Sequence, residues 1–321
     1  ISNKGWEISV SGVPVKVKNF EWKTIFNWSK NNSMVESLPE GIDKIQIGSG
    51  VYNVKSYAEV GKPYGAIYAK TFKRDAEGYI LCQLDGSPKE GQDYEYLGCV
   101  QADWRGGWNN VFRLGNFSFS VMFDFQKGGK FFSQTSIQSS VDGQSVKSLE
   151  GRDADFFSRK ILGESDEERY GFMRPQNANT PTANGQIYPD WGRPKGVVLP
   201  NCRYDEDVEG LAGQQVLGYC TPERYWMHYT SRDISRFIYD ASYVKLREIT
   251  VSYDLPKKWL RKTPFQTFRV AAVGRNIATL FANTPHGLDP QATSTTGNAQ
   301  GFERGFNLPS ATYGFDIKVS F

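Results

Sequence analysis

Apolar and polar side chains alternate without interruption over residues 313–321. The apolar positions are Tyr313, Phe315, Ile317, Val319 and Phe321, and Gly314, Asp316, Lys318 and Ser320 lie between them. In an extended strand these two sets point to opposite faces. A soluble domain that exposes such a strand at its edge risks aggregation, whereas a strand between lipid and water requires this alternation. The pattern therefore favours a strand in the wall of a membrane β-barrel.

Six earlier segments show the same two-residue period: residues 5–13, 20–31, 107–114, 117–127, 243–255 and 266–277. The gaps between the segments alternate in length: residues 14–19, 115–116 and 256–265 form the short ones, and the others have roughly 75, 115 and 35 residues. Compact domains seldom contain loops longer than about 15 residues, but barrels combine short periplasmic turns with long extracellular loops. We therefore predict an all-β fold in which about seven antiparallel strands form part of a transmembrane barrel.

Bacterial barrels have an even number of strands, so seven strands do not close one. The chain starts at Ile1 without a methionine or a signal peptide. We interpret residues 1–321 as the C-terminal part of a longer protein, in which the remaining strands come from residues before Ile1 or from another chain.

The composition agrees with a β protein that has water-exposed loops, and it argues against some classes of function. The 321 residues are 39% hydrophobic and 14% aromatic and include 32 glycines. The net charge of +3 gives no indication of nucleic-acid binding, and no apolar run reaches the roughly 18 residues of a membrane-spanning helix. Two alternatives stay open: a passive pore or adhesin on a smaller barrel, and a soluble β-sandwich that binds carbohydrate.

The four cysteines fall into two pairs of near neighbours, Cys82 with Cys99 and Cys202 with Cys220. In an oxidising compartment each pair can close a loop by a disulfide; the alternative is four thiols. The chain has two histidines and no C-x-x-C motif, so no zinc site is predicted.

Acidic residues give little indication of an enzyme. Asp153 and Asp155 lie close together in a long connection, as do Asp205, Glu206 and Asp207. The second group can supply oxygen ligands to Ca²⁺ but lacks the spacing of an EF-hand. Neither a nucleotide-binding motif nor a nucleophile motif is present. We expect a protein that is not an enzyme and has no cofactor, with Ca²⁺ as a possible ligand.

Aromatic residues crowd the long connections and are the candidate ligand contacts: Trp104, Tyr188, Trp191, Tyr225 and Trp226. Aromatic rings stack on sugars or pack against peptide side chains, although they can equally pack the loops against each other. On the strands, Asp124, Lys127, Glu248 and Asp254 are expected to face a water-filled interior.

Several sequence blocks resemble SusC/RagA-type TonB-dependent transporters of Bacteroidetes outer membranes. The most specific is Y-V-K-L-R-E-I-T-V-S-Y-D-L-P at 243–256, and Y-L-G-C-V-Q-A-D-W-R-G-G-W-N at 96–109 matches another family block except at 99–101, where the family has Asn-Pro-x-Pro. Further matches lie at 33–43, 61–75, 116–129, 273–281, 287–290 and in the terminal strand. The matches follow the family order along the whole chain.

The resemblance implies a 22-stranded barrel in the outer membrane, with a plug and a TonB-contacting segment that residues 1–321 do not include. It implies import of oligosaccharides, or alternatively oligopeptides, delivered by a SusD-like surface lipoprotein, with transporter–lipoprotein pairs forming a dimer. Outer-membrane barrels also imply a role for Tyr313, Gly314 and Phe321, as the insertion signal that the barrel-assembly machinery reads.

Overall fold

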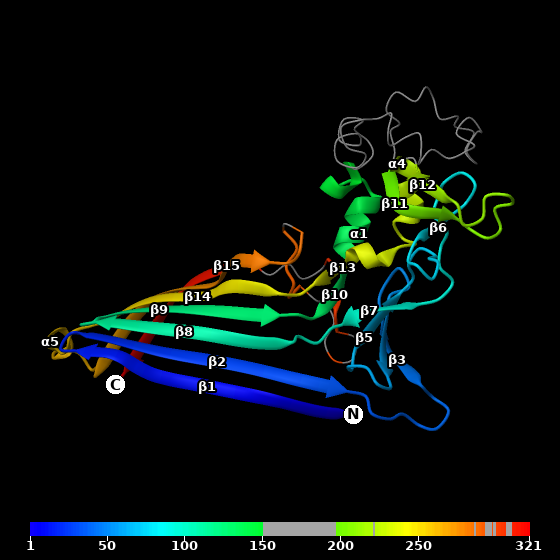
Figure 1. The fold of residues 1–321 in the computed structure, drawn as a ribbon. Helices are drawn as coiled ribbons and strands as arrows, with labels where there is room; N and C mark the ends of the chain where they lie inside the picture. The colour runs from blue at the N-terminus through cyan, green and yellow to red at the C-terminus, as the bar shows by residue number, and fades with distance from the viewer. Residues whose placement is uncertain (150–196, 221, 286, 293–296, 298–299, 306–309) are drawn as a thin grey trace.

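The computed structural model describes residues 1–149, 197–220, 222–285, 287–292, 297, 300–305 and 310–321. A long sheet, here called the wall, extends from a group of smaller sheets and short helices, here called the outer body (Figure 1). None of the helices in the described ranges is long and apolar enough to cross a membrane.

The wall contains the strands that the alternating pattern predicts. They are β1 (Ser2–Val17), β2 (Phe20–Met34), β8 (Trp104–Leu114), β9 (Phe117–Lys127), β14 (Tyr243–Asp254), β15 (Thr267–Ala282) and β17 (Thr312–Ser320). Each strand pairs antiparallel with the next, so the spatial order repeats the chain order. All seven predicted strands are confirmed, and β1, β2, β8 and β15 extend several residues beyond their predicted limits.

The short connections lie together at the end of the wall that is remote from the outer body (Figure 1). They are residues 18–19, residues 115–116 and residues 255–266, the last of which contains α5 (Lys257–Leu260). Gly115 has a φ of 58°, which glycine adopts more readily than other residues in such a tight turn. The long connections leave from the other end, as the alternation of gap lengths predicts.

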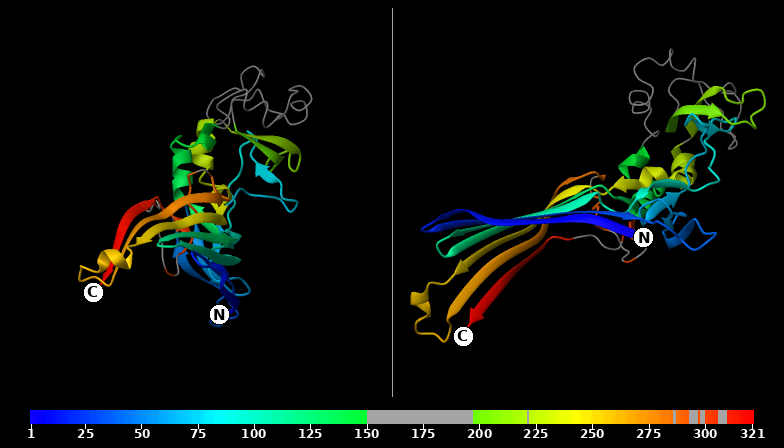
Figure 2. Two further views of the ribbon diagram at one scale, coloured as in Figure 1. Left: turned by 90° about the vertical axis from the view of Figure 1, so that its left-hand side faces the viewer. Right: turned by 60° about the horizontal axis from the view of Figure 1, so that its bottom comes forward.

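The wall is an open, twisted and curved sheet (Figure 2). Strands β1 and β17 form its two edges and do not pair with each other. The described residues thus form part of a curved sheet and no closed barrel.

The two faces of the wall differ in chemistry along every strand. One cross-strand row is apolar: Val15, Trp22, Phe112, Phe119, Val251, Ala272 and Phe315. The next row points the other way and is mainly polar: Lys16, Glu21, Arg113, Ser118, Ser252, Ala271 and Asp316. On the apolar face Phe315 is 87% exposed, and Trp6 is 74% exposed. A contiguous apolar face of this extent normally contacts a partner or a membrane.

The described parts of the long connections form the sheets and helical turns of the outer body. Its sheets contain β3 (Lys44–Ser49), β4 (Lys55–Glu59), β5 (Ala66–Ala69) and β7 (Glu95–Cys99); β12 (Gln215–Cys220), β11 (Val197–Tyr204) and β6 (Ile80–Cys82); and β13 (Ile238–Asp240), β10 (Lys130–Ser133) and β16 (Phe302–Glu303). Helix α1 (Gln134–Val141) and shorter helical turns at Val146–Leu149, Pro222–Arg224, Tyr225–Tyr229 and Ile234–Phe237 accompany them. The sequence analysis predicted none of these elements, because they are short and many are buried on both faces, which removes the two-residue period.

Two apolar clusters stabilise the outer body. One lies nearer the wall and includes Ile67, Phe132, Ile137, Phe237 and Phe302. The other packs β6, β11 and β12 against the turn at Tyr225–Tyr229. Because both clusters draw on two or three long connections, they hold these connections together over one end of the wall.

Candidate functional site

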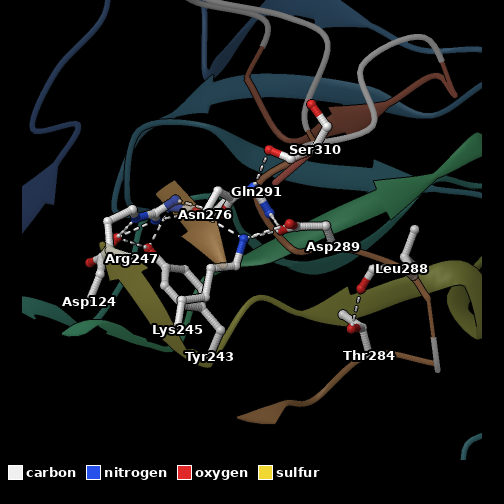
Figure 3. Close-up of polar contacts among 10 residues, drawn as sticks. All are labelled: Asp124, Tyr243, Lys245, Arg247, Asn276, Thr284, Leu288, Asp289, Gln291 and Ser310. Atoms are coloured by element: carbon white, nitrogen blue, oxygen red, sulfur yellow. Dashed lines mark hydrogen bonds and ion pairs between the residues drawn. The ribbon is translucent and has the colours of Figure 1, made fainter. Parts of the chain in front are cut away.

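A network of polar side chains joins the wall to the segment that follows β15, at the end of the wall next to the outer body (Figure 3). The Lys245 Nζ atom donates to both carboxylate oxygens of Asp289 at 2.6 Å and to Gln291 Oε1 at 2.9 Å. The Lys245 side chain is only 1% exposed. A buried ammonium of this kind is tolerated because its donors have acceptors and its charge has a counter-ion.

A β-bulge brings a second cation into the same network. Arg247 is the extra residue between Leu246 and Glu248, which pair with consecutive residues of β9. Its guanidinium donates to Asp124 Oδ2 from Nε at 3.1 Å and to Gln291 Oε1 from Nη2 at 2.6 Å. Gln291 Nε2 in turn donates to the Tyr243 hydroxyl at 2.5 Å. The segment after β15 is therefore fastened to β9 and β14 by a connected set of hydrogen bonds.

Pockets open around this end of the wall, and Arg105 at the start of β8 lines three of them, of which the two smaller are mainly polar. Their volumes are about 540, 390 and 260 Å³. The 390 Å³ pocket is also lined by Gln126, Tyr243, Gln291 and Gln300. Amide, hydroxyl and guanidinium groups in a concave site can fix the orientation of a small polar ligand.

Trp104 is the one predicted ligand contact that the structure places at a pocket. It is half-buried and contributes to the lining of the 260 Å³ pocket. It lies in phase with the apolar face, where its ring centroid is 6.4 Å from that of Phe125, whereas Arg105 lies on the polar face. Tyr225 and Trp226 are each 1% exposed and pack edge to face in the core of the outer body, so this arrangement offers them no surface to a ligand. Tyr188 and Trp191 lie outside the described residues, as do Asp153 and Asp155.

The charged residues predicted on the polar face find partners inside the wall. Asp254 pairs with Arg269 at 2.6 Å, Glu248 pairs with Arg275 at 3.0 Å, and Asp124 pairs with Arg247. The prediction for Lys127 is wrong: it is in register with Trp104 and lies in phase with the apolar face, because it continues the odd-numbered positions of β9.

The residues of the predicted insertion signal lie at the exposed edge of the wall. Tyr313 is on the apolar face of β17, with Gly314 on the opposite face, in register with Val273. Phe321 follows β17, and its ring centroid lies 5.2 Å from that of Phe265. This contact joins the end of β17 to the connection that precedes β15.

None of the four cysteines, all of which lie in the described ranges, forms a disulfide. The two expected pairings are therefore absent. Cys82 lies against Cys202, because β6 pairs in parallel with β11, and this contact and burial raise the pKa of the Cys82 thiol. Cys99 lies in another sheet, with its Sγ 3.4 Å from the Tyr64 carbonyl oxygen. Burial raises the pKa of Cys220 to about 12.

The acidic group at 205–207 is engaged by lysines. Lys73 Nζ donates to both oxygens of Asp205 at 2.9 Å, and Lys89 Nζ lies 2.8 Å from Asp205 Oδ2. Lys89 also pairs with Asp207. The two ammonium groups thus supply the positive charge next to these carboxylates.

The sequence analysis did not single out Arg105, Lys245, Arg247, Asp289 or Gln291. The available signal was their position: Arg105, Lys245 and Arg247 are charged residues at the ends of wall strands that adjoin long connections. Which of them meet depends on the bulge in β14 and on the path of the segment after β15, and neither feature follows from a local pattern.

Comparisons with known proteins agree with the fold. No protein-family profile matches the chain. TonB-dependent receptor P3 of Formosa agariphila is 23% identical over 335 residues, which cover 98% of this chain and 27% of that protein. TonB-dependent receptor P39 of the same organism is 21% identical over 181 residues, or 41% of this chain and 17% of that protein.

Solved structures of RagAB match over the whole chain. The RagAB peptide importer in the closed-closed state superposes with a TM-score of 0.55 at 15% identity, covering 99% of this chain and 29% of that chain. The RagAB peptide transporter gives a TM-score of 0.53 with the same identity and coverage. The chain spans little more than a quarter of the length of the relatives that it matches. The resemblance to SusC/RagA-type TonB-dependent transporters that the sequence motifs indicate is thereby confirmed.

Proposed function

We propose that the chain forms part of the barrel wall and the extracellular face of a TonB-dependent nutrient importer in the bacterial outer membrane. The observation that carries this proposal is the wall itself: seven sequential antiparallel strands with one exposed apolar face and one polar face. Only closed barrels and helices satisfy all backbone hydrogen bonds in lipid. The free edges of β1 and β17 would therefore pair with strands from the rest of the protein, in a barrel of 22 strands.

The substrate class that we propose first is oligosaccharides. The amide and hydroxyl groups that line the pockets at this end of the wall suit the hydroxyl groups of a sugar. A SusD-like surface lipoprotein would deliver the substrate to the outer body, and transporter–lipoprotein pairs would form a dimer. TonB would act through a plug outside residues 1–321. In an importer of this kind the chain would form the wall and contact the substrate, without catalysing a reaction.

Oligopeptides are a second candidate, because the structural neighbours are described as peptide importers or transporters. At 15% identity that likeness shows the fold alone, and the same polar pockets suit peptide groups as well as sugars.

Calorimetry on the whole transporter–lipoprotein complex in detergent tests the proposal, with a panel of oligosaccharides and oligopeptides. Binding of one oligosaccharide class supports the first candidate. Binding confined to peptides moves the assignment to the second. A complex that binds neither class and supports no TonB-dependent uptake in cells contradicts the importer.

A further inference from the structure

Arg105 occupies the centre of a polar row that crosses five strands of the wall. In register from β1 to β14, the row is Glu7, Ser29, Arg105, Gln126 and Tyr243. The row lies at the outer-body end of the polar face, and Arg105 lines all three pockets. A solute that enters any of them therefore lies next to Arg105.

The charge of Arg105 has no acidic partner among the residues that the structure describes. Its Nε donates to the neutral amide of Gln126 at 2.9 Å, and no ion pair forms there. The other charges of the 390 Å³ pocket are compensated: Asp124 by Arg247, and Lys130 by Asp240 at 3.5 Å. Glu7 lies in the same row two strands away and forms no ion pair with Arg105 in the described structure.

We propose that Arg105 binds a carboxylate of the transported oligomer, and that the substrate is therefore anionic. The proposal rests on the function proposed above. A guanidinium presents paired N–H donors in a fork that matches the two oxygens of a carboxylate. The hydrogen bond from Nε to Gln126 orients the fork and leaves the terminal amino groups directed to the ligand. The carboxylate can belong to a uronic acid in an oligosaccharide or to a peptide, since both present the same group.

Matched ligand pairs test this proposal on the whole transporter–lipoprotein complex. The oligosaccharide pair is oligogalacturonate and its carboxyl-reduced counterpart, and the peptide pairs are short peptides with a free or an amidated C-terminus. We expect the wild type to prefer the carboxylate member of one pair. Arg105→Gln should weaken binding of that member about ten- to a hundredfold, the usual worth of a charge-assisted hydrogen bond, and leave its neutral counterpart unchanged.

Arg113 supplies a matched control, because it lies on the same strand and on the same polar face but near the opposite end of the wall. Arg113→Gln should keep the wild-type preference, and Arg105→Lys should keep part of it, because charge without the fork is retained. A wild type that binds both members of a pair equally, or an Arg105→Gln variant that loses both equally, overturns the carboxylate site but leaves the importer intact. Failure of the wild type to bind any member contradicts the proposed function itself.

Discussion

At the scale of single residues, Asp205 is a buried charge at the end of β11, next to the apolar cluster of β6, β11 and β12. Its side chain is 3% exposed and lies between Lys73 and Lys89, which come from the connection between β5 and β7. Burial alone would raise the pKa of this carboxyl group, but hydrogen bonds from Lys89 and Lys73 outweigh that effect and lower the pKa of Asp205 to about 2. The carboxylate therefore links two long connections through charge.

Asp205→Asn should lower the free energy of unfolding of the outer body by about 2 kcal/mol, because two ammonium groups lose their buried counter-ion. Urea unfolding of the solubilised transporter, followed by tryptophan fluorescence, measures this loss. Asp207→Asn is the control, since Asp207 is 68% exposed and shares only Lys89; its effect should stay below about 0.5 kcal/mol. Equal losses in the two variants would contradict the role given to Asp205.

The stabilisation from Asp205 should depend on pH in one direction. Its pKa is lower in the folded state than the ordinary value of 3.8, so its contribution is complete above about pH 4 and is lost as the pH falls toward about 2. The difference in urea midpoint between the wild type and Asp205→Asn should therefore shrink between pH 6 and pH 2.5. A constant difference over this range would show that the lost stability does not come from the carboxylate charge.

At the scale of elements, the segment after β15 is held by the ends of β9 and β14. Asp289→Ala should leave the Lys245 ammonium buried without its counter-ion, which typically costs about 3–5 kcal/mol. The least costly response is release of the segment, so we expect faster proteolysis and faster hydrogen exchange at residues 283–292 in the whole transporter, with the wall unchanged.

Glu248→Ala is the control for this prediction. Glu248 lies on the same strand as Lys245 and pairs with Arg275 of β15; their side chains are 35% and 68% exposed, and such pairs contribute at most about 1 kcal/mol. If both variants leave the segment protected, the contacts of Gln291 with Arg247 and Tyr243 would be sufficient to hold it.

The elements also show what can be predicted from sequence. Strand β9 was predicted at its observed limits, because apolar and polar residues alternate along a strand whose two faces have different environments. Strand β5 was missed: Ala66–Ala69 is buried at every position, so the period vanishes. The parallel pairing of β6 with β11 joins residues more than a hundred positions apart, and it places Cys82 next to Cys202, whereas its expected partner Cys99 lies in another sheet.

The same limit applies to the candidate site. Trp104 and Trp226 are of the same residue type and both lie in or beside a long connection, yet the structure places Trp104 at a pocket and buries Trp226 in a core. A ring that binds a ligand and a ring that packs a core differ only in what surrounds them, and the surroundings of Trp226 come from three separate strands and a helical turn.

At the scale of the whole molecule, we expect a new charged side chain to be tolerated on the polar face of the wall and not on the apolar face. Phe119 lies in the apolar row that crosses all seven strands, and its chain neighbour Ser118 lies in the polar row. If lipid covers the apolar face, an arginine at position 119 must enter hydrocarbon, at a cost of about 2–4 kcal/mol near the middle of the bilayer. An arginine at position 118 would enter water.

Phe119→Arg should therefore reduce the folded, outer-membrane fraction of the whole transporter, while Ser118→Arg stays close to wild type. Heat-modifiable migration after membrane fractionation measures this fraction. If the two variants fold equally well, the apolar face contacts something other than lipid, and if only Ser118→Arg fails, the faces of the wall are assigned the wrong way round.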